Sequence, residues 1–250
     1  MDRRDAMGLA RSAWRSGKWG VARAIHPPAT ARQVYQPYTV DGGYSCRLLR
    51  VEDQAGWTAS RLVNEKRMRD WWPEAEDWER QSGRQAFSDH YLSWTRRSLR
   101  GEALPLALVG PDGFVGELLT WQLHAGGTHG EMGPWARPGG LPSTAMLAMA
   151  AGHLDNLFGR LGLGRVSAVT ATGNRHPLRV LEVLGFQHEG TLTKLRPVRG
   201  ALHDHEMHAI TRERWIERRP DCYARHRWST IHGDLPPLDV TGGPAVPGDG

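Results

Sequence analysis

The residues of this chain best suited to chemistry lie in a glycine-rich turn that opens a helix. The turn runs from Arg137 to Ala145 and reads Arg-Pro-Gly-Gly-Leu-Pro-Ser-Thr-Ala. Gly139 and Gly140 let a ligand approach the backbone closely, and a helix beginning near Ser143 presents unpaired N–H groups at the positive end of its dipole. Arg137 can add a charge-assisted hydrogen bond to a phosphate. The turn therefore indicates a site for a phosphate-bearing ligand, although an ordinary capped helix shows the same residue types.

The pattern of apolar residues predicts the elements that hold this turn in place. Alternating or short apolar runs predict strands at residues 44–51, 104–109, 114–121, 131–136, 165–170, 186–195 and 205–210. Helical spacing predicts helices from residue 53 toward 71 and at 77–99, 143–159 and 175–184, the last one ending at Gly185. This order of elements predicts an α/β fold with a mixed central sheet of about seven strands flanked by helices.

Several short motifs around the turn resemble those of one known family. They are Gly133-Pro134-Trp135 before the turn, Arg137 and Gly140 within it, Asn174 at the next helix, Gly185-Phe186, Glu189-Gly190, and Gly200 with Asp204. Together they are similar to the motifs of the GNAT N-acetyltransferases, over residues 44–215. Within that family the chain most resembles the Rim-type group, which acetylates ribosomal-protein N-termini, through residues 47–50, Trp72-Pro73 and Asp204.

The resemblance implies a donor, a reaction and a set of binding residues. Acetyl-CoA would be the acyl donor, and its acetyl group would pass to a primary amine by direct attack in a ternary complex. The backbone of Trp135, Ala136 and Arg137 would pair with the pantetheine amides like an added strand. The other cofactor-binding residues would be Gly139, Gly140, Leu141, Ser143, Thr144, Asn174 and Arg179. The acceptor would be a ribosomal or other protein N-terminus, or a small amine.

A base must take the proton of the attacking amine, and the sequence leaves its identity open. Glu131 and Glu117 lie on expected central strands, and Asn174 completes the catalytic set that the resemblance implies. His203 and His205, near the last strand, are further candidates. Each of these residues also has a structural interpretation, which for Asn174 is a helix N-cap. Four acidic residues either attract a cationic amine or cap the start of a helix. They are Glu74, Glu76, Asp77 and Glu79.

Three positions depart from the family pattern. Pro142 replaces the second small residue of the turn and has no N–H to offer a phosphate. Pro177 stands where the family has a serine near the departing thiolate, and Arg196 matches the position at which some Rim-type enzymes place a glutamate. The alternative function is therefore a catalytically degenerate GNAT-like protein that binds acyl-CoA or a protein partner.

The composition agrees with one sizeable domain and two extensions. A chain of 250 residues with a formal net charge of +5 is long enough for one core. We expect a basic N-terminal extension at 1–40, the acetyltransferase domain at 41–217, and a C-terminal extension at 218–250 that ends in a disordered Pro/Gly-rich tail. Residues 1–24 either form a basic amphipathic helix on an anionic surface or are a loosely docked extension.

The cysteines and the apolar runs limit the setting. Two distant cysteines, Cys46 and Cys222, form neither a disulfide framework nor a zinc site, and they favour the cytoplasm. We expect no metal site, including at the loop with His124 and His129, and no transmembrane segment. A homodimer is one of the oligomeric states that the sequence leaves open.

Overall fold

The structure is a computed structural model, and it describes residues 31–69, 71, 77–123, 128–198 and 200–226. Several parts of the chain that the sequence singled out therefore lie outside the described residues. They are the expected basic N-terminal helix, the Pro/Gly-rich tail, Trp72-Pro73, Glu74, Glu76 and His124. None of the described helices is long and apolar enough to cross a membrane.

One mixed sheet forms the centre of the described chain. Its eight strands have the order β1-β2-β3-β4-β5-β6-β8-β7, and among them β5 and β6 are parallel while the other neighbours are antiparallel. The strands are β1 (Tyr38–Val40), β2 (Tyr44–Leu48), β3 (Ala103–Gly110), β4 (Gly113–Trp121), β5 (His129–Ala136), β6 (Arg165–Ala171), β7 (Gln187–Val198) and β8 (Ala201–Thr211). The expected α/β fold is confirmed, and β1 is the strand that the sequence did not predict.

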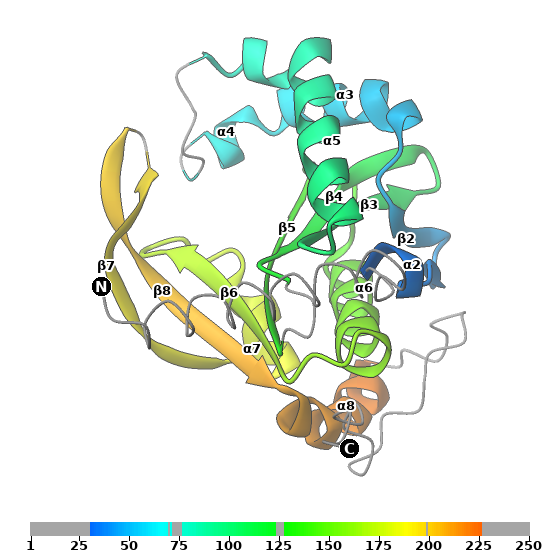
Figure 1. Cartoon of the computed structure of the whole chain (residues 1–250), viewed down its shortest axis with the longest axis vertical. Helices are drawn as coiled ribbons and strands as arrows, with labels where there is room; N and C mark the ends of the chain where they lie inside the picture. The colour runs from blue at the N-terminus through cyan, green and yellow to red at the C-terminus, as the bar shows by residue number, and fades with distance from the viewer. Residues whose placement is uncertain (1–30, 70, 72–76, 124–127, 199, 227–250) are drawn as a thin grey trace, which may run out of the picture.

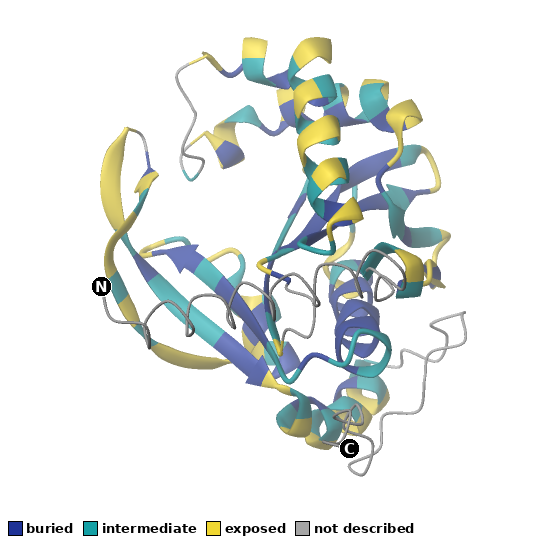
Figure 2. Cartoon of the chain, in the orientation of Figure 1, coloured by how far each residue is buried: buried dark blue, intermediate teal, exposed yellow. Residues whose placement is uncertain are grey.

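Helices cover both faces of this sheet. They are α2 (Ala31–Val34), α3 (Gln54–Val63), α4 (Glu65–Met68), α5 (Arg84–Leu99), α6 (Ser143–Asp155), α7 (Leu178–Leu184) and α8 (Arg212–His226). Figure 1 shows α3, α4 and α5 together at one end of the molecule and α6, α7 and α8 toward the other. Figure 2 shows that α6 is largely buried after its first turn, whereas β7 and the outer side of α5 are exposed.

Two helices begin later than predicted, for local reasons. Gly83, in extended conformation, separates α5 from a 3₁₀ turn at Arg80–Ser82, so the helix does not begin at residue 77. The helix α7 begins at Leu178 and not at residue 175, because a proline disfavours helical geometry in the residue before it and Pro177 follows His176. Gly185 ends α7 in the left-handed conformation, φ 90°, as predicted. The helix α8 was not expected, since its sequence is mostly polar.

A buried carboxylate attaches α8 to the core. Asp155, at the end of α6, is fully buried and accepts hydrogen bonds from Trp215 Nε1 at 2.8 Å, Arg219 Nε at 2.8 Å and Tyr223 Oη at 2.7 Å. Trp215 is itself fully buried. The helix therefore continues the packed domain through residue 217, where we expected an extension to begin; the division into three segments stays a prediction.

Two apolar cores lie on the two sides of the sheet. The larger one joins the sheet to α6, α7 and α8 and includes Met132, Leu154 and Trp215. The smaller one packs α3 and α5 on the other face and includes Trp57, Phe87 and Trp135. Trp57 and Trp78 are only 2% and 3% exposed, which favours core packing over ligand stacking for these two tryptophans.

A histidine in the larger core makes the stability of the protein depend on pH. His153 is fully buried, its Nε2 lies 2.6 Å from Thr120 Oγ1, and its Nδ1 has no hydrogen-bond partner in the described part of the chain. Burial lowers the pKa of this imidazole to about 3, from an ordinary value of 6.5. Between these values the unfolded chain binds the proton and the folded chain does not, so acid favours unfolding.

We expect His153→Gln to flatten the pH dependence of stability. In the native protein this histidine removes about 1.4 kcal/mol of unfolding free energy for each pH unit below its unfolded pKa, until its folded pKa is reached. Urea unfolding at a series of pH values between 6.5 and 4 measures this slope. The matched control is His176→Gln, at an exposed histidine. Equal slopes in the native protein and in His153→Gln would contradict the assignment.

Candidate active site

The candidate site is built where two neighbouring strands part. β5 and β6 pair only from His129–Glu131 to Arg165–Ser167. Beyond that point β5 continues to Ala136 beside β4, and β6 continues beside β8. Figure 1 shows the two strands close together at one end and separating toward the other. A row of backbone groups on each strand is therefore left without a strand partner.

The register decides which groups of β5 face the gap. Because Arg137 N donates to Val115 O at 2.8 Å, Arg137 and every second residue before it, Trp135 and Gly133, direct their backbone groups to β4. Met132, Pro134 and Ala136 face the gap instead. Of the three residues expected to pair with pantetheine, only Ala136 points its backbone there, and its carbonyl already accepts a hydrogen bond from Asn64 Nδ2 at 3.0 Å.

Pro134 stands in a central strand because of this geometry. A proline has no N–H, so it is tolerated where no ladder bond is required of it. Pro134 lies opposite Leu118 in a pair that makes no hydrogen bond across β4 and β5, and its nitrogen faces the gap. The chain therefore loses no sheet hydrogen bond, and the gap has one backbone donor fewer.

The glycine-rich turn lies at the open end of the gap and has the predicted form. Gly139 has φ +69°, a left-handed conformation that favours glycine, and Gly140 N donates to Arg137 O at 3.1 Å. A Cβ on Gly140 would meet the Arg137 side chain at 2.5 Å, so the arginine stem lies directly over this glycine. The buried Arg137 Nε has no hydrogen-bond partner among the described residues. A donor left in this way fits an anionic ligand.

The helix α6 begins at Ser143, as predicted. Ser143 and Thr144 are exposed, Leu141 is half-buried against the larger core, and the first intrahelical bond joins Met146 N to Pro142 O at 2.9 Å. The N-terminal amides of the helix therefore remain available at the turn, except at Pro142, which has none.

Asn174 and Arg179 lie apart from this turn in the sequence and have local partners. Asn174 Oδ1 accepts from His176 N at 3.3 Å in a turn, so the residue does not cap α7, which begins four residues later. Arg179 Nη1 lies 3.1 Å from Glu182 Oε2 on the exposed side of α7. Their roles toward a cofactor stay predictions.

Glu131 lies where β5 and β6 begin to part, and Arg196 binds it. The two residues form a bidentate ion pair, with Nη1 2.9 Å from Oε1 and Nη2 3.0 Å from Oε2, and the carboxylate is 4% exposed. Arg196 comes from β7, so this pair joins the β7–β8 hairpin to β5. Pairing across β6 places Glu131, Ser167 and Ala209 on one face of the sheet. His205, four residues before Ala209 on β8, lies on the same face.

His205 and an aromatic pair belong to the same face. His205 is 6% exposed, and its Nδ1 lies 2.9 Å from His203 O. Trp121, opposite Glu131, packs edge-on against Trp94 of α5 with ring centroids 6.2 Å apart. A Cβ on Gly133 would meet the Trp121 ring at 3.1 Å, so this ring covers the strand next to the gap.

Glu117 is the centre of a buried polar cluster. The residue is fully buried; its Oε2 accepts from Trp57 Nε1 at 3.1 Å and from Trp135 Nε1 at 2.9 Å, and its Oε1 lies 2.8 Å from His90 Nε2. Sequence analysis singled out the carboxylate and not its partner His90, which is 27 residues away on α5 and carries no local signal. All the partners of Glu117 belong to the smaller core or its edge.

The remaining polar candidates do not assemble into a metal centre. Within the ranges that the structure describes, no three His, Cys, Asp or Glu side chains come together in a way that could hold a metal ion. Of the acidic group before α5, Asp77 pairs with Arg80 at 3.0 Å.

Comparison with known proteins identifies the family. The model of the acetyltransferase (GNAT) domain matches residues 46–187, more than half of the chain. The chain therefore belongs to the GNAT acetyltransferase family. No curated protein sequence matches it.

Solved structures agree with this assignment. The chain is similar to Mycobacterium smegmatis RimJ in complex with CoA-disulfide, with a TM-score of 0.67 and 28% identity over 77% of this chain and 94% of that one. It shares its fold with the ribosomal-protein-S5-alanine acetyltransferase of Vibrio fischeri, at TM-score 0.63 and 18% identity over 71% and 98% of the two chains. The same holds for RimL, a ribosomal L7/L12 α-N-protein acetyltransferase in complex with coenzyme A, at TM-score 0.63 and 15% identity over 70% and 98%.

We expect Glu117→Gln to lower stability and to leave turnover of the folded enzyme almost unchanged. The glutamine keeps one acceptor oxygen where the carboxylate serves three donors, so a buried donor loses its partner, at a cost of about 2 kcal/mol. Urea unfolding measures this loss, and Glu182→Gln, at an exposed carboxylate, is the control. A large fall in kcat with native stability would instead make Glu117 a catalytic residue.

Proposed function

We propose that this protein is an acetyl-CoA-dependent N-acetyltransferase that acts on a primary amine. The observation that carries the proposal is the gap between β5 and β6, which is edged by unpaired backbone groups and leads to the Arg137–Ser143 turn. Membership of the GNAT family and the likeness to RimJ crystallised with CoA-disulfide support the same donor.

The turn would hold the phosphate end of the donor. Arg137 brings a guanidinium with a buried, unpartnered Nε, and Ser143 and Thr144 bring the N-terminal amides of α6. The backbone of Met132 and Ala136, facing the gap, would bind amide or carbonyl groups of the donor in the manner of an added strand. Because Pro134 and Pro142 lack an N–H, the remaining donors carry more of the binding.

Glu131 is the residue we propose as the base. The amine nitrogen would attack the acetyl carbonyl carbon, the carbon–sulfur bond would break, and the thiolate of CoA would leave while the amine proton passes to a carboxylate, directly or through water. Glu131 lies at the closed end of the gap, and Arg196 fixes both of its oxygens. An acceptor must therefore displace one hydrogen bond of Arg196 or reach the carboxylate through a water molecule.

The acceptor would bind on the face that carries Glu131. Trp94 and Trp121 form an aromatic wall on one side of this face, and the β7–β8 hairpin bounds the other. The Rim-type neighbours make a protein N-terminus the first acceptor class to test. Both cysteines are free and buried, in agreement with a cytoplasmic location. A homodimer remains a proposal that none of the described contacts supports.

A binding-only relative is the second candidate. The observation that favours it is the complete engagement of Glu131 by Arg196, together with Pro177 just before α7 in place of a hydroxyl. Release of free thiol from acetyl-CoA, in the presence of peptides with free N-termini, separates the two candidates. Saturable binding without thiol release across peptides and small amines supports the second; no binding of acetyl-CoA overturns both.

We expect Arg137→Gln to raise the KM for acetyl-CoA by about tenfold, with little change in kcat, because the lost contact is made equally in ground and transition states. Steady-state kinetics at saturating acceptor measures both constants. Arg84→Gln, which removes a charge from the exposed start of α5, is the matched control and should leave KM unchanged. An equal rise of the KM in both variants would mean that the effect comes from the overall charge of the protein and not from a contact of Arg137.

We expect Glu131→Gln to lower kcat by about a hundredfold, since general base catalysis contributes that much, and to leave the KM for acetyl-CoA nearly unchanged. Arg196→Gln keeps the carboxylate and removes its ion-pair partner, so it serves as the control for lost positioning. It should retain far more activity than Glu131→Gln at the same fraction folded. If Glu131→Gln has native kcat, the base lies elsewhere, and His205 is the next residue to replace.

A further inference from the structure

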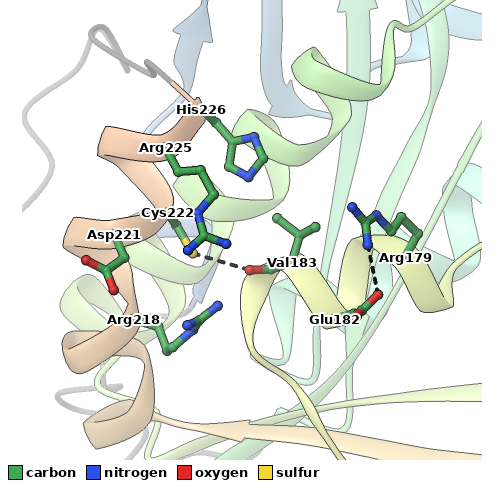
Figure 3. Close-up of a pocket in the computed structure, with 8 residues that line it drawn as sticks. All are labelled: Arg179, Glu182, Val183, Arg218, Asp221, Cys222, Arg225 and His226. Carbon is green, nitrogen blue, oxygen red and sulfur yellow. Dashed lines mark hydrogen bonds and ion pairs between the residues drawn. The ribbon is translucent and has the colours of Figure 1, made fainter.

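A hollow lies between α7 and α8. Its volume is about 280 Å³, near the lower end for small-molecule sites, and the residues that line it include Arg179, Val183, Arg218, Asp221, Cys222 and Arg225. Cys222 donates to Val183 O at 3.3 Å and closes the inner side. The hollow therefore has an apolar floor and a rim of arginines (Figure 3).

Two arginines of α8 point their charges into this hollow. Arg218 and Arg225 are seven residues apart and so share one face of the helix. Figure 3 shows both guanidinium groups near the hydrogen bond between Cys222 and Val183. Burial raises the pKa of the Cys222 thiol, Arg218 and Arg225 act in the opposite direction, and Asp221 adds a smaller raising effect. Two like charges are therefore held close to one thiol.

The acidic residues nearby do not neutralise these arginines. Glu182 is engaged by Arg179, with Oε2 3.1 Å from Nη1. Figure 3 shows the Asp221 carboxylate on the side of α8 away from Val183, and Asp221, which also lines the hollow, offsets only one of the two charges. Within the described part of the chain neither Arg218 nor Arg225 forms an ion pair. The hollow therefore has an excess of positive charge at its centre.

A buried donor in the same hollow lacks an acceptor. Arg218 Nε is buried over Gly185 and has no hydrogen-bond partner among the described residues; the Gly185 carbonyl accepts from Arg214 Nε at 2.7 Å instead. A buried guanidinium donor is costly to leave unpaired. An anion with several oxygens would satisfy it and would also relieve the repulsion between the two arginines.

We propose that the hollow between α7 and α8 binds a phosphomonoester, with the phosphate between Arg218 and Arg225 and a small organic part against Val183. The same chemistry has two sources: the 3′-phosphate of CoA, or a separate phosphorylated metabolite. The inference stands on the arginines of α8 and does not require that the protein transfer acetyl groups.

Titration calorimetry on the full chain tests this, with glycerol 3-phosphate as the first probe. The native protein should bind it saturably, and Arg218→Gln/Arg225→Gln should weaken binding by about tenfold or more, the loss expected for charge-assisted hydrogen bonds. The matched control, Arg84→Gln/Arg96→Gln, removes two exposed charges from α5 and should leave the affinity unchanged. Arg225→Gln alone, which removes no contact with Gly185, keeps the test valid if the double variant unfolds.

Two further titrations distinguish the sources. If CoA supplies the phosphate, the double variant weakens CoA and not 3′-dephospho-CoA, and glycerol 3-phosphate competes with CoA. If the ligand is separate, CoA affinity is unchanged and glycerol 3-phosphate binds to the CoA-saturated protein. The proposal is overturned if neither glycerol 3-phosphate nor the 3′-phosphate of CoA depends on these arginines, or if the control variant weakens binding equally.

Discussion

An unpaired stretch of backbone in the middle of a sheet costs free energy unless other groups satisfy it, and this protein maintains such a stretch between β5 and β6. Two features reduce the cost on β5. Pro134 has no N–H to satisfy, and Asn64 donates to the Ala136 carbonyl. The rest of the site follows from the gap, because the turn at Arg137, the amides of α6 and the carboxylate of Glu131 are placed along its edges.

The two faces of the central strands lie in different environments. On the face toward α6, Thr120 and Met132 belong to a closely packed interior in which His153 stays neutral. On the opposite face, Glu117 and Glu131 are both buried carboxylates, yet their partners differ. Glu117 accepts from two indoles of the core and pairs with His90 at its edge, whereas Glu131 is held by an arginine from a hairpin next to the proposed acceptor face. The position of each partner, rather than burial alone, is what distinguishes the structural role of Glu117 from the base that we propose at Glu131.

The parts of this molecule that depend on neighbouring residues could be predicted from the sequence. Local sequence determines the places of the predicted strands along the chain, the turn at Gly139 and Gly140, and the end of α7 at Gly185. The structure has all of these features. The helix α8 could not be found, because its buried positions are few and its anchor, Asp155, lies 60 residues before Trp215. The pairs Glu131–Arg196 and Glu117–His90 are equally hidden, since only the folded sheet brings them together.

The ion pair between Glu131 and Arg196 also constrains how this sequence can change. Its two members lie 65 residues apart, and Arg196, itself 36% exposed, neutralises a carboxylate that is only 4% exposed. Replacing Arg196 by glutamate would put two carboxylates face to face, whereas replacing Glu131 would leave an arginine that water can hydrate. A change at Arg196 is therefore tolerated best together with a change at Glu131, so these two positions should covary in an alignment of the family.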